Sequence, residues 1–187
     1  MVYKNQALKK YTDDLAARLP APGGGSCAAL SACLGTCLIS MVVEFTLGKQ
    51  KYAKYYDRLT LILTQSEKLR RQLLDLVDLD VEAFKSKNIK KCLNVPLKTL
   101  ELCVAAIRLC PDLIKMGNSH LLSDVAVAAI LIEAGFSSAY FNVIINLKYM
   151  KDQNLTKKLR ARIRRNSKTV LRIRQQTEAK IGDIIAG

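Results

Sequence analysis

Two aspartates and two asparagines occupy positions where the helical pattern of the sequence favours apolar side chains. Asp80 interrupts the stripe that runs through Leu76 and on to Phe84, and Asp124, Asn142 and Asn146 recur at helical spacing along a later apolar segment. Burying an unpaired carboxylate is costly, so each aspartate is paired, protonated or faces a cavity. The aspartates are therefore candidates for proton transfer, and the asparagines for recognition of a polar ligand. A structural hydrogen bond to a helix end is the alternative for each.

A run of three glycines precedes the most apolar segment of the chain. Pro22 is followed by Gly23, Gly24, Gly25 and Ser26. Glycines let backbone N–H groups approach a ligand, and a helix start favours an anion or a carbonyl oxygen. A tight turn with Ser26 as the N-cap residue is the alternative. The run matches neither the Walker A pattern nor the dinucleotide-binding glycine pattern.

The cysteines and the histidine give no metal site of the usual spacing. The chain has six cysteines, no C-x-x-C pair, and one histidine. The cysteines lie in apolar helical segments, which is typical of reduced thiols in a cytoplasm. We expect six free thiols, no bound metal and no permanently bound cofactor.

Almost the whole sequence has helical periodicity, and no segment alternates with period two over a useful length. Asn94 is the expected N-cap of the fourth helix, with Pro96 in its first turn. The expected helices are 3–19, 26–47, 51–84, 95–116, 119–149 and 155–185. The sequence thus predicts an all-α, single-domain bundle of about six helices over residues 1–187.

Two of these helices, 26–47 and 121–147, are too apolar for a normal solvent-exposed face. Membrane spans are one interpretation. Both segments, however, are rich in small residues, and the second contains Asp124 and Asn142. We therefore expect two largely buried helices in a protein without a membrane partner, and a homodimer that covers the remaining apolar surface.

The charge balance is strongly basic, with 30 Lys and Arg against 16 Asp and Glu. Residues 148–180 hold 12 of the basic residues and only 2 of the acidic ones. This concentration predicts either a solvated basic face or a surface for an anionic partner. A nucleic-acid partner is disfavoured, because aromatic residues for base stacking are few and no helix-turn-helix signature is present.

Five motifs in order resemble the cyclodeaminase/cyclohydrolase family. They read PAPGGGSCAALSACLGTCLISMV, TLGKQKY, DLDVEAF, MGNSHLLSDVAVAAILIEA and NVIINL. The resemblance implies an all-helical, dimeric folate enzyme of the cytoplasm. Such an enzyme converts 5-formimidoyl-tetrahydrofolate to the 5,10-methenyl form with release of ammonia, or opens the methenyl form with water.

On this resemblance, the substrate is a tetrahydrofolate derivative, which in cells can carry a polyglutamate tail. Asp124 and Asp80 are the expected catalytic carboxylates, placed together beside the glycine run, because a carboxylate can stabilise the cationic methenyl form and carry a proton. The expected substrate-binding residues are Pro22, Gly23, Gly24, Gly25, Ser26, Lys49, Asn118, Asn142 and Asn146. Lys49 and the basic last helix are the expected partners of the anionic tail.

One segment departs from the family pattern. Only residues 85–94 separate Phe84 from Val95, where family members usually carry a longer segment. Two other functions therefore remain open from sequence: a non-catalytic folate-binding or helical interaction module, and a basic helical nucleic-acid binder.

Overall fold

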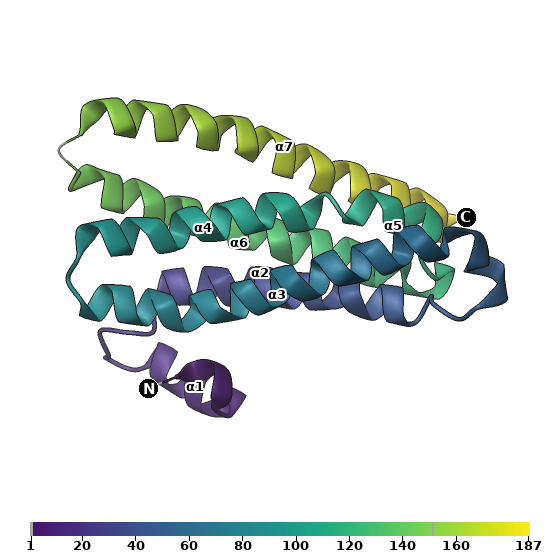
Figure 1. The fold of residues 1–187 in the computed structure, drawn as a ribbon, viewed down its shortest axis with the longest axis horizontal. Helices are drawn as coiled ribbons and strands as arrows, with labels where there is room; N and C mark the ends of the chain where they lie inside the picture. The colour runs from purple at the N-terminus through teal and green to yellow at the C-terminus, as the bar shows by residue number, and fades with distance from the viewer. Residues whose placement is uncertain (1, 151) are drawn as a thin grey trace.

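The computed structural model describes residues 2–150 and 152–187, and it is built from helices throughout (Figure 1). The predicted all-α fold is confirmed. The α-helices of the described residues are α1 (Leu8–Ala16), α2 (Gly24–Glu44), α3 (Tyr56–Lys85), α4 (Ile89–Ile107), α5 (Cys110–Met116), α6 (Leu122–Lys148) and α7 (Gln153–Ala186). Three short 3-10 turns, η1 (Tyr3–Asn5), η2 (Gln50–Tyr55) and η3 (Ser119–Leu121), join or precede them.

The centre of the bundle is the antiparallel pair α2 and α6. Helix α3 packs along α2, α4 packs on α6 and α3, and α7 lies over α6, α4 and α5 (Figure 1). Helix α1 stands apart from the bundle near the start of α2. The start of α2, the end of α3, the start of α4 and the end of α6 therefore meet at one end of the bundle, which we call the glycine-loop end.

The fourth predicted helix differs from the structure at both ends. Helix α4 begins at Ile89, and its N-cap is Asn88, whose side chain accepts hydrogen bonds from the N–H groups of Lys90 and Lys91. The expected cap, Asn94, lies inside the helix, as does Pro96, because Leu93 and Pro96 are buried against the core. The helix ends at Ile107, and α5 starts afresh at Cys110 with a proline in its first turn.

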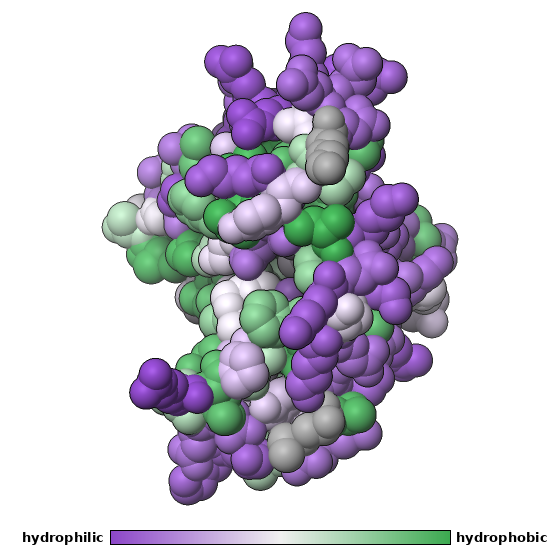
Figure 2. All heavy atoms as spheres, turned by 90° about the vertical axis from the view of Figure 1, so that its left-hand side faces the viewer, coloured by the Kyte–Doolittle hydropathy of each residue, from purple (hydrophilic) through white to green (hydrophobic). Residues whose placement is uncertain are grey.

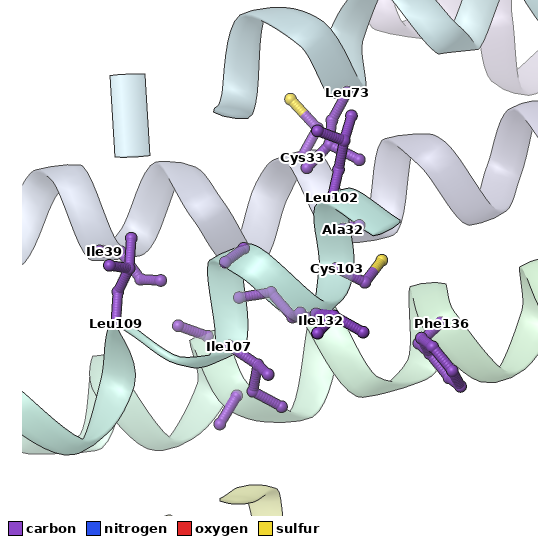
Figure 3. Close-up of a cluster of buried hydrophobic side chains, with 14 of the residues drawn as sticks. Ala32, Cys33, Ile39, Leu73, Leu102, Cys103, Ile107, Leu109, Ile132 and Phe136 are labelled. Carbon is purple, nitrogen blue, oxygen red and sulfur yellow. The ribbon is translucent and has the colours of Figure 1, made fainter. Parts of the chain in front are cut away.

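The core lies between α2, α3, α4 and α6. Figure 3 shows part of this core, including Ile39 of α2, Ile107 of α4 and Ile132 of α6. All three are fully buried. The last helix is amphipathic, since the side chains of Ile163, Val170, Ile173, Thr177 and Ile181 are buried against the bundle.

Helices α2 and α6 have the length and hydropathy of membrane spans, which core helices of a bundle also have. Of their most apolar 18-residue windows, 61% is buried in α2 and 39% in η3–α6. Helix α6 is thus less buried than expected. Its outer side is exposed and nearly uncharged, with Val127, Ile130, Phe141 and Ile145 on one face.

All six cysteines are free thiols, as the sequence predicted.

Candidate active site

The glycine run forms the first turn of α2, so the helix begins earlier than predicted. Gly23 is the N-cap residue, and Gly24 and Gly25 are the first two helical residues. Ser26 is therefore not the N-cap. Its side chain is buried against Tyr11, with 3.2 Å between the two hydroxyl oxygens. Its N–H group donates across the bundle to Oδ2 of Asp80 in α3, at 2.9 Å.

The glycine at position 25 is what allows Asp80 to approach α2. A Cβ atom built on Gly25 would lie 2.6 Å from Cγ of Asp80, which is closer than real Cβ contacts come. The glycine run is therefore more than a sharp turn, because it admits a carboxylate from another helix to the N-terminus of α2. The positive end of the helix dipole and the Ser26 N–H group both stabilise this carboxylate.

Burial nevertheless has a larger effect on the pKa of Asp80 than the hydrogen bond from Ser26. Desolvation raises the pKa of this carboxyl above the ordinary value of 3.8, and the hydrogen bond from Ser26 only partly opposes the shift. No lysine or arginine pairs with Asp80 in the described part of the chain. A carboxyl with a raised pKa and an open approach is suited to accept a proton and return it during a reaction.

Asp80 lies in a cleft of about 670 Å³ at the glycine-loop end. This volume is in the range of small-molecule sites. Its lining residues are Pro20, Ala21, Gly23, Gly24, Gly25, Asp80, Phe84, Lys85, Lys87, Ile89, Cys92, Asn142, Ile145, Asn146 and Tyr149. Figure 2 views this end of the molecule, where apolar and small side chains lie between hydrophilic groups.

Two of the predicted asparagines line the same cleft from α6. The side-chain nitrogen of Asn142 donates to the carbonyl oxygen of Ser138 at 3.0 Å, and its side chain faces Gly24. The side-chain nitrogen of Asn146 donates to the carbonyl oxygens of Cys92 and Asn142. The side-chain oxygens of both asparagines accept no hydrogen bond from the described residues and remain available to a ligand.

The small residues in the middle of α6 serve helix packing. A Cβ atom on Gly135 would lie 2.8 Å from the carbonyl oxygen of Ala28, and one on Gly35 would lie 2.7 Å from that of Ala128. Backbones of α2 and α6 therefore touch at two levels. The small residues of α6 therefore make room for α2.

The structure does not place Asp124 beside the glycine run of its own chain. Asp124 lies in the first turn of α6, 18 residues before Asn142, which corresponds to about 27 Å along a helix. The prediction that Asp124 and Asp80 share a cleft is therefore wrong within one chain. Helical spacing placed Asp124 and Asn142 on the same side of α6 correctly, but at opposite ends.

Lys49 and Asn118 lie with Asp124 at the far end of the bundle. Lys49 lines a smaller hollow of about 300 Å³ with Thr46 and Tyr52. Asn118 is 5% exposed, and its side chain donates to the carbonyl oxygen of Phe45 and accepts from the N–H group of His120. Its own N–H group donates to Thr46. Asn118 thus ties the end of α2 to the start of α6.

Sequence reasoning missed several lining residues of the cleft. Lys85 is the last residue of α3, Lys87 lies in the short connection to α4, and Ile89, Cys92 and Tyr149 lie at nearby helix ends. Pro22, in contrast, is buried beneath the glycine run and does not line the cleft. The four lysines of the sequence KSKNIKK were the one signal that could have indicated the rim of a site for an anion.

Comparisons with known proteins agree with this geometry. The sequence model described as formiminotransferase-cyclodeaminase matches residues 7–88 and 85–165. A methenyltetrahydrofolate cyclohydrolase of Methylorubrum extorquens is 34% identical over 172 residues, covering 80% of this chain and 83% of that protein. The formimidoyltransferase-cyclodeaminase of Rattus norvegicus is 33% identical over 180 residues, covering 84% of this chain, which spans about a third of the rat protein.

A solved structure shares the entire architecture. The formiminotetrahydrofolate cyclodeaminase of Thermotoga maritima superposes with a TM-score of 0.92 at 27% identity, covering 97% of this chain and 98% of that chain. The helical bundle is thus held in common with a family member of known structure. By its sequence and its fold, this chain belongs to the formiminotransferase-cyclodeaminase family.

Proposed function

We propose that this chain is a folate one-carbon enzyme that acts on the bridge between N5 and N10 of a tetrahydrofolate. It closes the bridge of 5-formimidoyl-tetrahydrofolate with loss of ammonia, opens the bridge of 5,10-methenyl-tetrahydrofolate with water, or does both. The observation that carries the proposal is Asp80, a carboxyl with a raised pKa in a cleft of small-molecule size. The named relatives act on the same pair of folates.

Asp80 supplies the proton transfer that both reactions need. In ring closure, N10 attacks the formimidoyl carbon, the C–N10 bond forms, and the amino group leaves as ammonia after it gains a proton. In ring opening, water attacks the methenyl carbon and loses a proton, and N5 gains one as the C–N5 bond breaks. A single carboxyl whose pKa is raised by burial can serve as acid and base in turn.

The remaining polar groups of the cleft orient the substrate. The N–H groups of Gly24 and Gly25 belong to the first turn of α2, where backbone donors have no intrahelical acceptor. The side-chain oxygens of Asn142 and Asn146 add acceptors on the opposite wall. A pterin presents donors and acceptors along one edge, which fits such a mixed set. Neither reaction transfers electrons, so the proposal requires no redox cofactor.

The proposed enzyme is a homodimer that forms through the uncharged outer face of α2 and α6. Leu34 is 50% exposed and Phe141 71% exposed on this face. The two helices carry only four charged residues: Glu44 and Asp124 at the far end, Glu133 within α6, and Lys148 at the glycine-loop end. A patch that spans two whole helices is unusual on a monomer and typical of an interface.

Charge favours an antiparallel arrangement of the two copies. Glu44 and Asp124 lie at the far end of the face and Lys148 at the glycine-loop end, and none of them forms an ion pair within the described residues. A two-fold axis perpendicular to the helices places the acidic end of one copy against the basic end of its partner. Asp124 of one chain would then approach the glycine-loop end of the other.

The test is spectroscopic. The protein is incubated separately with 5-formimidoyl- and 5,10-methenyl-tetrahydrofolate, and the methenyl absorbance is followed. Ring closure makes the absorbance rise in the first case, and ring opening makes it fall in the second. Absence of both changes, with intact helical content, would refute the enzymatic proposal. We place the protein in the cytoplasm, as its relatives in folate metabolism suggest.

A further inference from the structure

The last helix, α7, runs along one edge of the bundle and carries a dense group of basic side chains on its exposed side (Figure 1). Its buried stripe, which includes Ile163 and Val170, packs against the bundle. Residues 153–177 contain nine Lys and Arg and no Asp or Glu. Seven of the nine are exposed and form no ion pair with another described residue, namely Lys157, Lys158, Arg160, Arg164, Arg165, Lys168 and Arg172.

Four of these cations recur at intervals of four residues and form one row along the helix, which we call the basic row. Its members are Arg160, Arg164, Lys168 and Arg172. At this spacing the side chains lie one above another, about 6 Å apart along the axis, and like charges so placed destabilise a helix. Glu101 of α4 pairs with Arg162 beside the row and with no member of the row. A charge pattern that opposes helix stability and is left uncompensated indicates a functional constraint.

The surroundings of the basic row favour a phosphate backbone over a membrane surface as its partner. Three of the four members are arginines, whose planar guanidinium groups bind phosphate with two parallel hydrogen bonds. A membrane-binding helix turns its apolar side to the lipid, but in α7 that side is buried against the bundle. Uncharged side chains that can donate to phosphate or sugar oxygens accompany the cations, namely Asn166, Ser167, Thr169, Gln175 and Gln176.

Helix α7 also lacks the groups that single-stranded nucleic acids need. No aromatic residue occurs in residues 153–186, so the helix offers no platform for base stacking. This absence disfavours single strands, but it does not affect contacts with phosphates, which supply essentially all of the sequence-independent affinity for a duplex. No residue of α7 lines the Asp80 cleft, so the basic row is separate from the proposed folate site.

We propose that the basic row of α7 binds the phosphate backbone of a nucleic-acid duplex without preference for its sequence. The row is about 18 Å long, and over that distance the two strands of a duplex carry about ten phosphates. The three other unpaired cations, Lys157, Lys158 and Arg165, extend the same surface. The proposed dimer forms through α2 and α6 and leaves α7 uncovered, so each dimer presents two such rows. This binding does not depend on the folate reaction.

The test compares two variants with the same net charge. The row variant replaces the four members of the basic row with Gln. The control variant replaces four exposed basic residues outside α7 that form no ion pair with a described residue: Arg18→Gln, Lys51→Gln, Lys54→Gln and Lys68→Gln. Fluorescence anisotropy with short labelled RNA and DNA duplexes of mixed sequence measures the affinity, and the tighter of the two identifies the kind of duplex.

The wild type should bind a duplex with an affinity that falls steeply as the salt concentration rises from about 50 to about 200 mM. The row variant should lower the affinity at about 50 mM salt by about tenfold or more, the scale of four exposed ion pairs. It should also lower the slope of log affinity against log salt concentration by about three to four, because each phosphate contact contributes about 0.9. The control variant should change both quantities far less.

The melting temperature separates binding from folding. At low salt the row variant should melt at a higher temperature than the wild type, because three like-charge pairs are removed. Equal losses of affinity in the two variants would overturn the proposal, since binding would then follow net charge and not the basic row. Binding of the wild type to phosphatidylserine vesicles but to neither duplex would also overturn it and would assign the row to a membrane surface.

Discussion

Both ends of the bundle hold polar residues of the family motifs, but the hydrogen bonding of these residues differs between the two ends. At the glycine-loop end, Asp80 lies in a cleft with one hydrogen bond, and the side-chain oxygens of Asn142 and Asn146 are free of partners among the described residues. At the far end, Asn118 and Tyr52 are bonded to neighbouring segments and close the bundle. A polar residue on an apolar helix is therefore a functional candidate only when its hydrogen bonds are left incomplete.

Replacement of Asp80 should have the largest effect. Asp80→Asn keeps the size and the acceptor for Ser26 but removes the proton carrier, so turnover should fall by roughly two orders of magnitude or more. Single-turnover measurements of the methenyl absorbance provide the check, with folate affinity measured in parallel. Equal losses of affinity and turnover would indicate that Asp80 contributes to substrate binding and not to the chemical step.

The stability of Asp80→Asn relative to the wild type should increase as the pH rises. Because the folded-state pKa of Asp80 is raised, its stability contribution is fully present below the ordinary value of 3.8 and is lost as pH rises through the folded pKa. The melting temperature of Asp80→Asn relative to the wild type should therefore increase from pH 4 to pH 8. A constant difference between the two pH values would contradict a desolvated carboxyl.

Mixing two inactive variants tests whether the ends meet in the dimer. Asp124→Asn should also lower turnover by about two orders of magnitude if it reaches the partner's cleft. Refolding Asp80→Asn and Asp124→Asn chains together should then restore about a quarter of the wild-type activity, since half of the dimers are mixed and each contains one intact site. Sedimentation should show twice the chain mass. If a confirmed mixed dimer shows no recovery of activity, each active site is built from the residues of one chain only.

Gly25→Ala should disturb the Asp80 cleft with a smaller effect on turnover. The added methyl group would push the carboxylate away from the Ser26 N–H group, and a misplaced catalytic group commonly costs about tenfold to a hundredfold in rate. Gly182→Ala in α7 is the control, since nothing lies within 4 Å of its Cβ position. Wild-type turnover in Gly25→Ala would show that the close approach is unimportant.

At the far end, the main effect should be on stability. Asn118→Ala removes two side-chain hydrogen bonds at a nearly buried site, which should lower the free energy of unfolding by about 1–3 kcal/mol. Chemical denaturation measures this loss, and turnover per folded dimer should fall far less than in Asp80→Asn. A catalytic defect without loss of stability would mean that the far end contributes chemistry through Asn118.

The sequence predicted the helical fold and the Asp80–glycine region, because periodicity and glycine placement are local signals. It could not predict which residues share an end of the bundle. Asp124 and Asn142 have the same angular position on α6, but periodicity carries no information on how far along a neighbouring helix each one lies. The predicted start of the fourth helix was wrong for a related reason. Asn88 and Asn94 are equally good N-cap residues locally, and the burial of Leu93 and Pro96 decides between them.

The backbone contact of Gly35 and Gly135 has a consequence for evolution. A Cβ atom at either position would clash with a backbone carbonyl oxygen of the opposite helix. Neither glycine can therefore be replaced in evolution without a shift of the two helices. Gly135 is seven residues from Asn142, about 10 Å along the helix, and touches nothing in the cleft. This remote contact nonetheless fixes the spacing of α2 and α6, which form two walls of the cleft.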